Sequence, residues 1–87
     1  MTTTQLYEKA LTKWGIGNQC IKLSEECGEL VQAICKFSLK KGRKSSVASE
    51  IADVQILCEQ ITYALNLKED VLKYRNLKLK KVEKRLK

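Results

Sequence analysis

The sequence contains no proline and only four glycines among 87 residues. Sheets need frequent turns, and turns are built largely from these two residue types. An all-β fold of this length is therefore excluded, and long uninterrupted helices are favoured. Aromatic residues make up 6% of the chain, so the core of such a fold has to be mainly aliphatic.

Apolar residues recur at helical spacing in four segments, which predict one all-α domain spanning residues 1–87. The expected helices cover about 3–14, 18–40, 46–65 and 68–87. A break at Gly15 and Gly17 separates the first two helices, and Ser45 and Ser46 are expected to cap the third. Short connections predict antiparallel neighbouring helices, hence a four-helix bundle.

Several classes of protein are excluded by what the sequence lacks. Without histidine there is no Ser-His-Asp or Cys-His nucleophile pair, no HExxH zinc site and no Glu-x-x-His di-iron centre. No apolar run approaches the roughly 18 residues of a membrane span. The start of the chain also lacks the pattern of a signal peptide. We therefore expect a cytoplasmic protein without a membrane partner.

The four cysteines, Cys20, Cys27, Cys35 and Cys58, include no Cys-x-x-Cys pair. The first three are spaced by seven and eight residues on one expected helix, too far apart to bridge one another. We interpret Cys20, Cys27 and Cys58 as small core residues in a reducing compartment. Cys35 lies on the opposite face of its helix and is expected to be exposed.

The net charge of +7 is concentrated at the end of the chain. Residues 68–87 hold nine basic and three acidic side chains, whereas the preceding residues are nearly balanced. Lys78, Lys81 and Arg85 share one helical face at spacings i, i+3 and i+7. This helix could face phosphates, bind nucleic acid or simply be solvated.

Each of the two long helices carries an acidic pair at the same position relative to its apolar stripe. On the second helix the expected core stripe is Ile16, Cys20, Leu23, Cys27, Leu30, Ile34 and Phe37. On the third it is Val47, Ile51, Val54, Cys58, Ile61 and Leu65. Glu26 and Glu50 lie on the rims of these stripes, with Glu29 and Asp53 one step further round. Antiparallel packing can therefore bring four carboxylates into one patch.

Four converging carboxylates repel one another, and burial adds a desolvation cost to each of them. Proton uptake, basic partners or divalent cations would relieve both effects. Among cations, an all-oxygen donor set selects Mg²⁺, Mn²⁺ or Ca²⁺. Mg²⁺ keeps several waters and usually accompanies substrate phosphates. The alternative is a solvated acidic surface. Gly28, inside the second helix, favours close approach of another group because glycine costs helix stability.

These acidic residues form a two-part motif, Glu25-Glu26-Cys27-Gly28-Glu29 followed after 20 residues by Glu50-Ile51-Ala52-Asp53. The motif and its apolar flanks resemble the EExxE…ExxD signature of the MazG-like all-α nucleoside triphosphate pyrophosphohydrolases. A Trp-Gly with a following glutamine upstream, and a Lys-Leu-x-Lys pattern downstream, fit the same family. The similarity spans most of the chain.

The resemblance implies an enzyme that uses Mg²⁺, with Mn²⁺ as an alternative, to split a nucleoside triphosphate into monophosphate and pyrophosphate. The metal ligands would be Glu26, Glu29, Glu50 and Asp53. Glu25 or Glu26 would orient or deprotonate the attacking water. The family forms homodimers or homotetramers, so oligomerisation is expected to complete the bundle.

Other side chains are candidates for substrate contacts. Lys78, Lys81 and Arg85 could meet phosphate oxygens and stabilise developing charge. Trp14 and Gln19 could contact the base by stacking or amide hydrogen bonds. The alternatives are packing in the core or in a dimer interface for Trp14, and no substrate contact for Gln19. Two rival functions remain: a nucleic-acid-binding module that uses the basic last helix, and a helical dimerisation or regulatory protein without catalysis. The acidic pairs argue against both.

Overall fold

The computed structural model describes residues 1–87 and contains four helices and no strand. These are α1 (Thr3–Trp14), α2 (Ile16–Ser38), α3 (Lys44–Ala64) and α4 (Lys68–Arg85). The prediction of an all-helical chain with four helices is confirmed. None of the four combines the length and the apolarity needed to cross a membrane.

Local sequence signals explain where α1 begins and ends. The Thr2 hydroxyl accepts a hydrogen bond from the Gln5 backbone at 3.1 Å, and the Gln5 side chain accepts one from the Thr2 backbone at 2.8 Å. This capping box satisfies two amides that a free helix end would leave unpaired. Gly15 ends α1 with a φ of 82°, a conformation that glycine adopts without strain. The predicted break is confirmed there, but α2 begins directly afterwards and includes Gly17.

The turn between α2 and α3 differs from the prediction at both ends. α2 stops at Ser38 rather than near Lys40, and Arg43, not a serine, precedes the first residue of α3. At Gly42 a Cβ atom would lie 3.0 Å from the Lys36 Cβ, so the turn folds tightly onto the end of α2. The helix α3 therefore begins directly after this turn, at Lys44, and Ser45 and Ser46 lie inside it.

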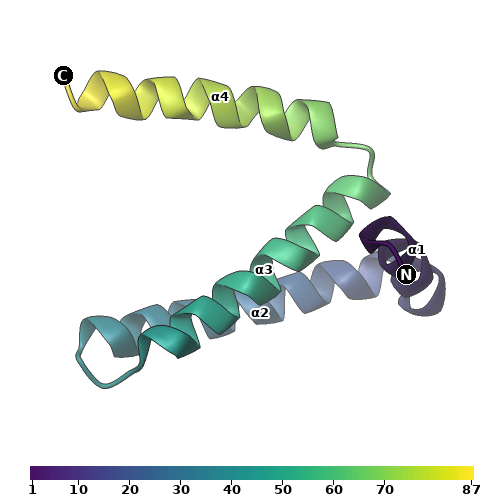
Figure 1. Cartoon of the computed structure of the whole chain (residues 1–87), viewed down its shortest axis with the longest axis horizontal. Helices are drawn as coiled ribbons and strands as arrows, with labels where there is room; N and C mark the ends of the chain where they lie inside the picture. The colour runs from purple at the N-terminus through teal and green to yellow at the C-terminus, as the bar shows by residue number, and fades with distance from the viewer.

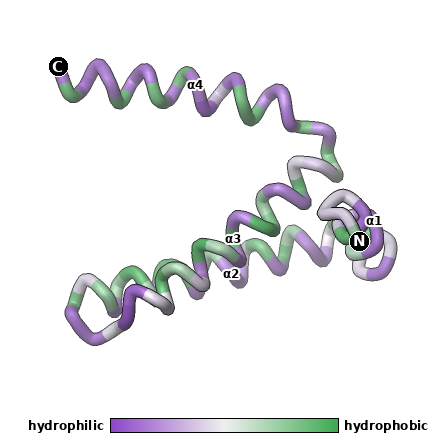
Figure 2. The backbone as a smooth tube through the Cα atoms, in the orientation of Figure 1, coloured by the Kyte–Doolittle hydropathy of each residue, from purple (hydrophilic) through white to green (hydrophobic).

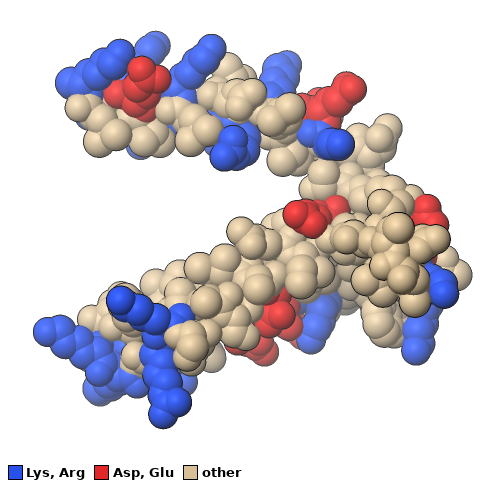
Figure 3. Space-filling model, in the orientation of Figure 1, with Lys and Arg blue, Asp and Glu red and all other residues tan.

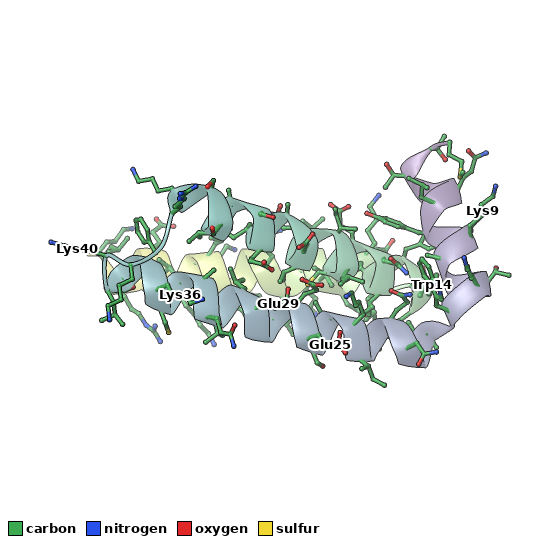
Figure 4. The ribbon with its side chains drawn as sticks, turned by 90° about the horizontal axis from the view of Figure 1, so that it is seen from below. Lys9, Trp14, Glu25, Glu29, Lys36 and Lys40 are labelled. Carbon is green, nitrogen blue, oxygen red and sulfur yellow. The ribbon has the colours of Figure 1, made fainter.

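The helices form a hairpin with two appendages (Figure 1). α2 and α3 pack as an antiparallel pair, α1 lies across the open end of this hairpin, and α4 turns back over it without packing against it. The expectation of antiparallel neighbours is thus met for α2 and α3, whereas α1 crosses α2 steeply (Figure 4). A single chain does not close a four-helix bundle.

The seam between α2 and α3 follows alternating spacings of three and four residues, as in a coiled coil. Its buried and half-buried members are Gln19, Leu23, Glu26, Leu30 and Ala33 on α2, and Val47, Glu50, Val54, Leu57, Ile61 and Ala64 on α3. Glu26 and Glu50 are therefore members of the seam, and their predicted position on the rim is wrong. The sequence interpretation took the middle of each apolar arc as the contact face, whereas α2 meets α3 along one edge of its arc.

The apolar residues of α2 and α3 that lie outside the seam form two exposed rows beside it. Each row repeats every seven residues, one position after a seam residue. The α2 row is Cys20, Cys27 and Ile34, and the α3 row is Ile51, Cys58 and Leu65, the residue that directly follows α3. Figure 2 shows hydrophobic residues along this hairpin and in alternation along α4. All four cysteines are free thiols and all are exposed, so the predicted burial of three of them is wrong for a single chain.

Two tyrosine–glutamate pairs fix α1 to α3. The Tyr7 hydroxyl donates to Glu59 at 2.7 Å, and the Tyr63 hydroxyl donates to Glu8 at 2.6 Å. The two rings are tilted against each other, with centroids 6.5 Å apart. Burial, followed by the hydrogen bond to Glu59 and its charge, raises the pKa of Tyr7 to about 12. These contacts position the end of α1, and with it Trp14, beside the hairpin.

The raised pKa of Tyr7 predicts a loss of stability at alkaline pH. The folded chain holds the phenolic proton more tightly than the unfolded chain, whose tyrosine titrates near pH 10.0. The stability from this contact is complete below that pH and disappears as the pH rises toward 12. We expect the free energy of unfolding to fall less steeply over this interval in Tyr7→Phe, as measured by urea unfolding. Equal slopes in the two proteins would contradict this assignment.

Candidate functional site

Three carboxylates meet in the middle of the α2–α3 seam. One oxygen from each of Glu26, Glu29 and Glu50 lies within 4.8 Å of the other two. We call this group the acidic trio. The i,i+3 spacing on α2 places Glu26 and Glu29 on one face of the helix, and the antiparallel seam brings Glu50 opposite them. Glu25 and Glu29 are labelled on α2 in Figure 4.

The acidic trio is only partly neutralised by the chain. Lys22, one turn before Glu26, holds its carboxylate at 3.2 Å. This hydrogen bond lowers the pKa of Glu26 against the opposing effect of burial. The pKa of Glu29 is raised, chiefly by its hydrogen bond to Glu26, then by the charges of Glu26 and Glu50. At neutral pH the ionised Glu29 carboxylate therefore lowers the free energy of unfolding of the metal-free protein. The free energy of unfolding recovers as the pH falls through the raised pKa of Glu29.

Two carboxylate oxygens in the acidic trio are buried and have no hydrogen-bond partner. They are the Oε2 atoms of Glu26, whose residue is 6% exposed, and of Glu50. A buried ionised oxygen without a donor is costly, and proteins normally satisfy such atoms. A hard divalent cation bound by oxygen ligands would satisfy both. The residues present therefore fit a Mg²⁺ or Mn²⁺ ion.

The other two predicted acidic residues lie outside the acidic trio. Asp53 is half-buried and lines the same cavity as Glu26, so it borders the site from the next turn of α3. Glu25 is exposed and lies 3.8 Å from the Lys22 ammonium. The prediction from helical periodicity that the proposed ligands converge is thus confirmed for three of the four. At Gly28 a Cβ atom would meet no other atom within 4 Å, so the predicted role of this glycine in close packing is wrong within one chain.

A cavity of about 480 Å³ opens on the α1 side of the acidic trio. Its walls combine an exposed indole with apolar and amide side chains, and Glu26 and Asp53 border it. Trp14 is 52% exposed, so it is not a core residue, and Gln19 is only 6% exposed. Trp14 and Gln19, the two candidates for base contacts, both line this cavity.

A second cavity, of about 320 Å³, lies on the opposite side of the acidic trio, toward the hairpin turn. Glu29 and Glu50 line it together with Lys36 and Ser46. Around it Lys and Arg side chains gather at the tip of the hairpin (Figure 3). The cations of this tip are Lys36, Lys40, Lys41, Arg43 and Lys44. The acidic trio thus lies between the cavity beside Trp14 and a smaller polar cavity near the basic tip of the hairpin.

The three predicted phosphate-binding residues of α4 are not brought to the acidic trio within one chain. Lys78, Lys81 and Arg85 are exposed on a helix that stands apart from the hairpin (Figure 1). Basic side chains line α4 along its length (Figure 3). Within one chain α4 contacts α3 but not α2, so these cations stand away from the acidic trio.

Comparison with known proteins adds no relative: no family model, no curated protein and no solved structure matches the chain.

Three residues of the site were missed by the sequence interpretation. Lys22 lies four residues before Glu26, and this spacing alone predicts an ion pair. Gln60 lies seven residues after Asp53 and so shares its helix face. Lys36 lies seven residues after Glu29, again on the same face. Helical spacing from the acidic residues would have found all three.

Replacing one carboxylate of the acidic trio should stabilise the metal-free protein. Glu50 has no ion-pair partner, so Glu50→Gln removes repulsion without breaking a salt bridge. We expect Tm to rise in EDTA, by about 4–8 °C for each kcal/mol relieved. Mg²⁺ should raise the Tm of the unsubstituted protein but not that of the variant. A lower Tm of the variant in EDTA would show that Glu50 is a structural hydrogen-bond acceptor instead.

Proposed function

We propose that the chain is a Mg²⁺-dependent nucleoside triphosphate pyrophosphohydrolase of the MazG-like type. The observation that carries the proposal is the buried Glu26, with an unpaired carboxylate oxygen, beside Glu29 and Glu50. The motif places these residues in the ligand positions of that family, with Asp53 as the fourth. Bound cations would neutralise the triphosphate and lower the pKa of water, which is the chemistry that carboxylates alone do not supply.

The reaction is hydrolysis at the α-phosphorus. A water oxygen forms a bond to this phosphorus, and the bond from the same phosphorus to the bridging oxygen of the β-phosphate breaks. Pyrophosphate leaves, and the water proton passes to a carboxylate, Glu26 or Glu25. The lowered pKa of Glu26 keeps it ionised at neutral pH and so able to orient that water. Lys22 fixes the Glu26 carboxylate and acts as a positioning residue.

The two cavities beside the acidic trio suggest how a nucleotide would lie. The cavity lined by Trp14 and Gln19 suits the base, through stacking and amide hydrogen bonds. The basic tip of the hairpin, including Lys36, suits the phosphate end. The bound triphosphate would then run along the hairpin, from the α1 end toward the turn.

A homodimer, or a tetramer of two dimers, would complete the fold. Only two apolar residues, Ala33 and Leu57, are buried in one chain, which is little core for 87 residues. The exposed heptad rows on α2 and α3 are shared by every copy, so two hairpins can bury them against each other as a four-helix arrangement. The same assembly gives α4 a second chain to pack on and brings Lys78, Lys81 and Arg85 within reach of a neighbouring site.

The reaction class can be tested with deoxynucleoside triphosphates, Mg²⁺ and water enriched in ¹⁸O. We expect equal amounts of monophosphate and pyrophosphate, with the ¹⁸O label in the monophosphate. No turnover should occur in EDTA. Release of orthophosphate, or label in pyrophosphate, would contradict attack at the α-phosphorus. A folded protein that turns over none of the nucleotides would contradict the proposal as a whole.

The free basic face of α4 favours nucleic-acid binding as the second candidate function. Such binding would weaken steeply with salt, with a slope set by the phosphates contacted. A gel-shift titration that shows no complex at about 10⁻⁴ M protein, the weak end of non-specific affinity, would exclude it.

A further inference from the structure

The cavity on the turn side of the acidic trio connects the trio with the basic tip of the hairpin. Glu29 and Glu50 of the trio, and Lys36 and Ser46 near the tip, line this one space. Lys36 follows Glu29 by about two helical turns, so both lie on one face of α2, roughly 10 Å apart along its axis (Figure 4). The volume of about 320 Å³ equals that of about ten water molecules in the liquid. The space is therefore large enough for a diphosphate group that contacts both ends.

The donor side chains in this cavity have no partner within the chain. Lys36 forms no ion pair, and neither Ser46 nor Gln32 makes a side-chain hydrogen bond. All three residues are exposed, so a ligand in the cavity can contact them. Ser46 also lies in the first turn of α3, where the helix dipole favours an anion. An ammonium, a hydroxyl and an amide group together offer the donors that phosphate oxygens accept from.

The charge around the cavity determines when a phosphate group can bind there. Two carboxylates and one ammonium group line it, so the metal-free cavity is net negative and repels an anion. Divalent cations held by the acidic trio would reverse this balance. Binding of a phosphate group and binding of a cation are therefore coupled, and each raises the affinity of the other by the same factor. A basic surface that binds anions without the trio would show no such coupling.

We propose that Lys36 and Ser46 form a phosphate-binding subsite, which takes a diphosphate group only when the acidic trio holds a divalent cation. This inference rests on the proposed function, because the pyrophosphate that the reaction releases has the charge and length to occupy the subsite. The last two phosphates of a nucleotide and free pyrophosphate share this chemistry. Pyrophosphate is then a product that competes with the substrate for the site.

The test is equilibrium dialysis of the full chain against radiolabelled pyrophosphate, in Mg²⁺ or in EDTA. We expect saturable binding in Mg²⁺ and at least about tenfold weaker binding in EDTA. Orthophosphate is too short to reach from the trio to Lys36, so it should bind at least about tenfold more weakly than pyrophosphate. Binding that is equally strong in EDTA, or that a single-stranded oligonucleotide displaces there, would show a general anion or nucleic-acid surface and overturn the inference.

A matched pair of variants tests the role of Lys36. Lys36→Gln should weaken pyrophosphate binding in Mg²⁺ by about tenfold or more, since it removes a charge-assisted hydrogen bond. Lys41→Gln removes the same charge from the tip at an exposed position that does not line the cavity, so its affinity should stay within about twofold. Circular dichroism checks that both variants are folded. Equal losses in the two variants would show diffuse attraction by the tip and overturn the subsite.

Turnover of nucleotides separates the failure of this inference from that of the proposed reaction. Pyrophosphate release by a protein in which Lys36→Gln leaves pyrophosphate affinity unchanged would overturn the subsite and leave the reaction standing. Pyrophosphate binding that needs both Mg²⁺ and Lys36, in a protein that turns over no nucleotide, would support the subsite and contradict the reaction. No binding of pyrophosphate by the unsubstituted protein in Mg²⁺ would overturn the inference.

Discussion

Glu26→Gln should reduce pyrophosphate release at least about thousandfold while the helix content stays unchanged. The substitution keeps the size of the side chain but removes a charge that the proposal uses twice, as a cation ligand and as an acceptor for the water proton. Loss of general-base catalysis alone typically costs a factor of 10² to 10⁴. The measurement is the steady-state rate in Mg²⁺, with circular dichroism as the check on folding.

Glu69→Gln provides the matched control for this variant. Glu69 lies in the first turn of α4, is exposed and has no ion pair, so its neutralisation should leave the rate within about twofold. If Glu26→Gln retained more than a tenth of the activity, the acidic trio would not be the catalytic centre. If Glu26→Gln lost its helix content, the same measurement on Asp53→Asn would decide the question, because Asp53 is only half-buried.

The second large effect is expected on assembly, from Ile34→Glu. Ile34 belongs to the exposed heptad row of α2, and the proposed dimer buries it next to a second copy. A carboxylate there would have to be buried or would separate the two chains, at a cost of several kcal/mol. Each 1.4 kcal/mol weakens the dissociation constant tenfold, so we expect a loss of more than a hundredfold. Sedimentation equilibrium measures this directly.

The same helix offers the control. Ile21 is more exposed than Ile34 and lies on the opposite face of α2, outside the seam and both rows. Ile21→Glu should therefore leave the assembly intact and its Tm nearly unchanged. Ile34→Glu should give a smaller species with reduced helix content, because one chain buries so few apolar residues. Equal behaviour of the two variants would show that the rows are not the interface.

The positions of the helices could be predicted from the sequence because their signals are local. Glycine placement and apolar periodicity located α1 nearly to the residue, and the antiparallel pairing of α2 with α3 followed from their short connection. The convergence of Glu26, Glu29 and Glu50 was also predictable, since equal phase on two antiparallel helices brings equivalent residues to one side.

The contact face of α2 was not predictable in the same way. Its apolar arc is wide enough for two partners, and the arc alone does not say which edge meets α3. The structure uses the edge that carries Glu26 and leaves Cys27 outside, which turns a rim carboxylate into a buried one. The placement of α4 was equally out of reach, because α4 contacts no helix of the chain other than α3.

A titration with Mn²⁺ followed by electron paramagnetic resonance tests most directly whether the acidic trio is a divalent-cation site, on which the proposed reaction depends. Free Mn²⁺ gives a sharp signal that is lost when the ion binds. We predict saturable binding by the unsubstituted protein and by Glu69→Gln, and a loss of at least tenfold in affinity in Glu50→Gln. Equal binding by all three proteins, or no binding at millimolar Mn²⁺, would contradict the metal site and the proposed reaction with it.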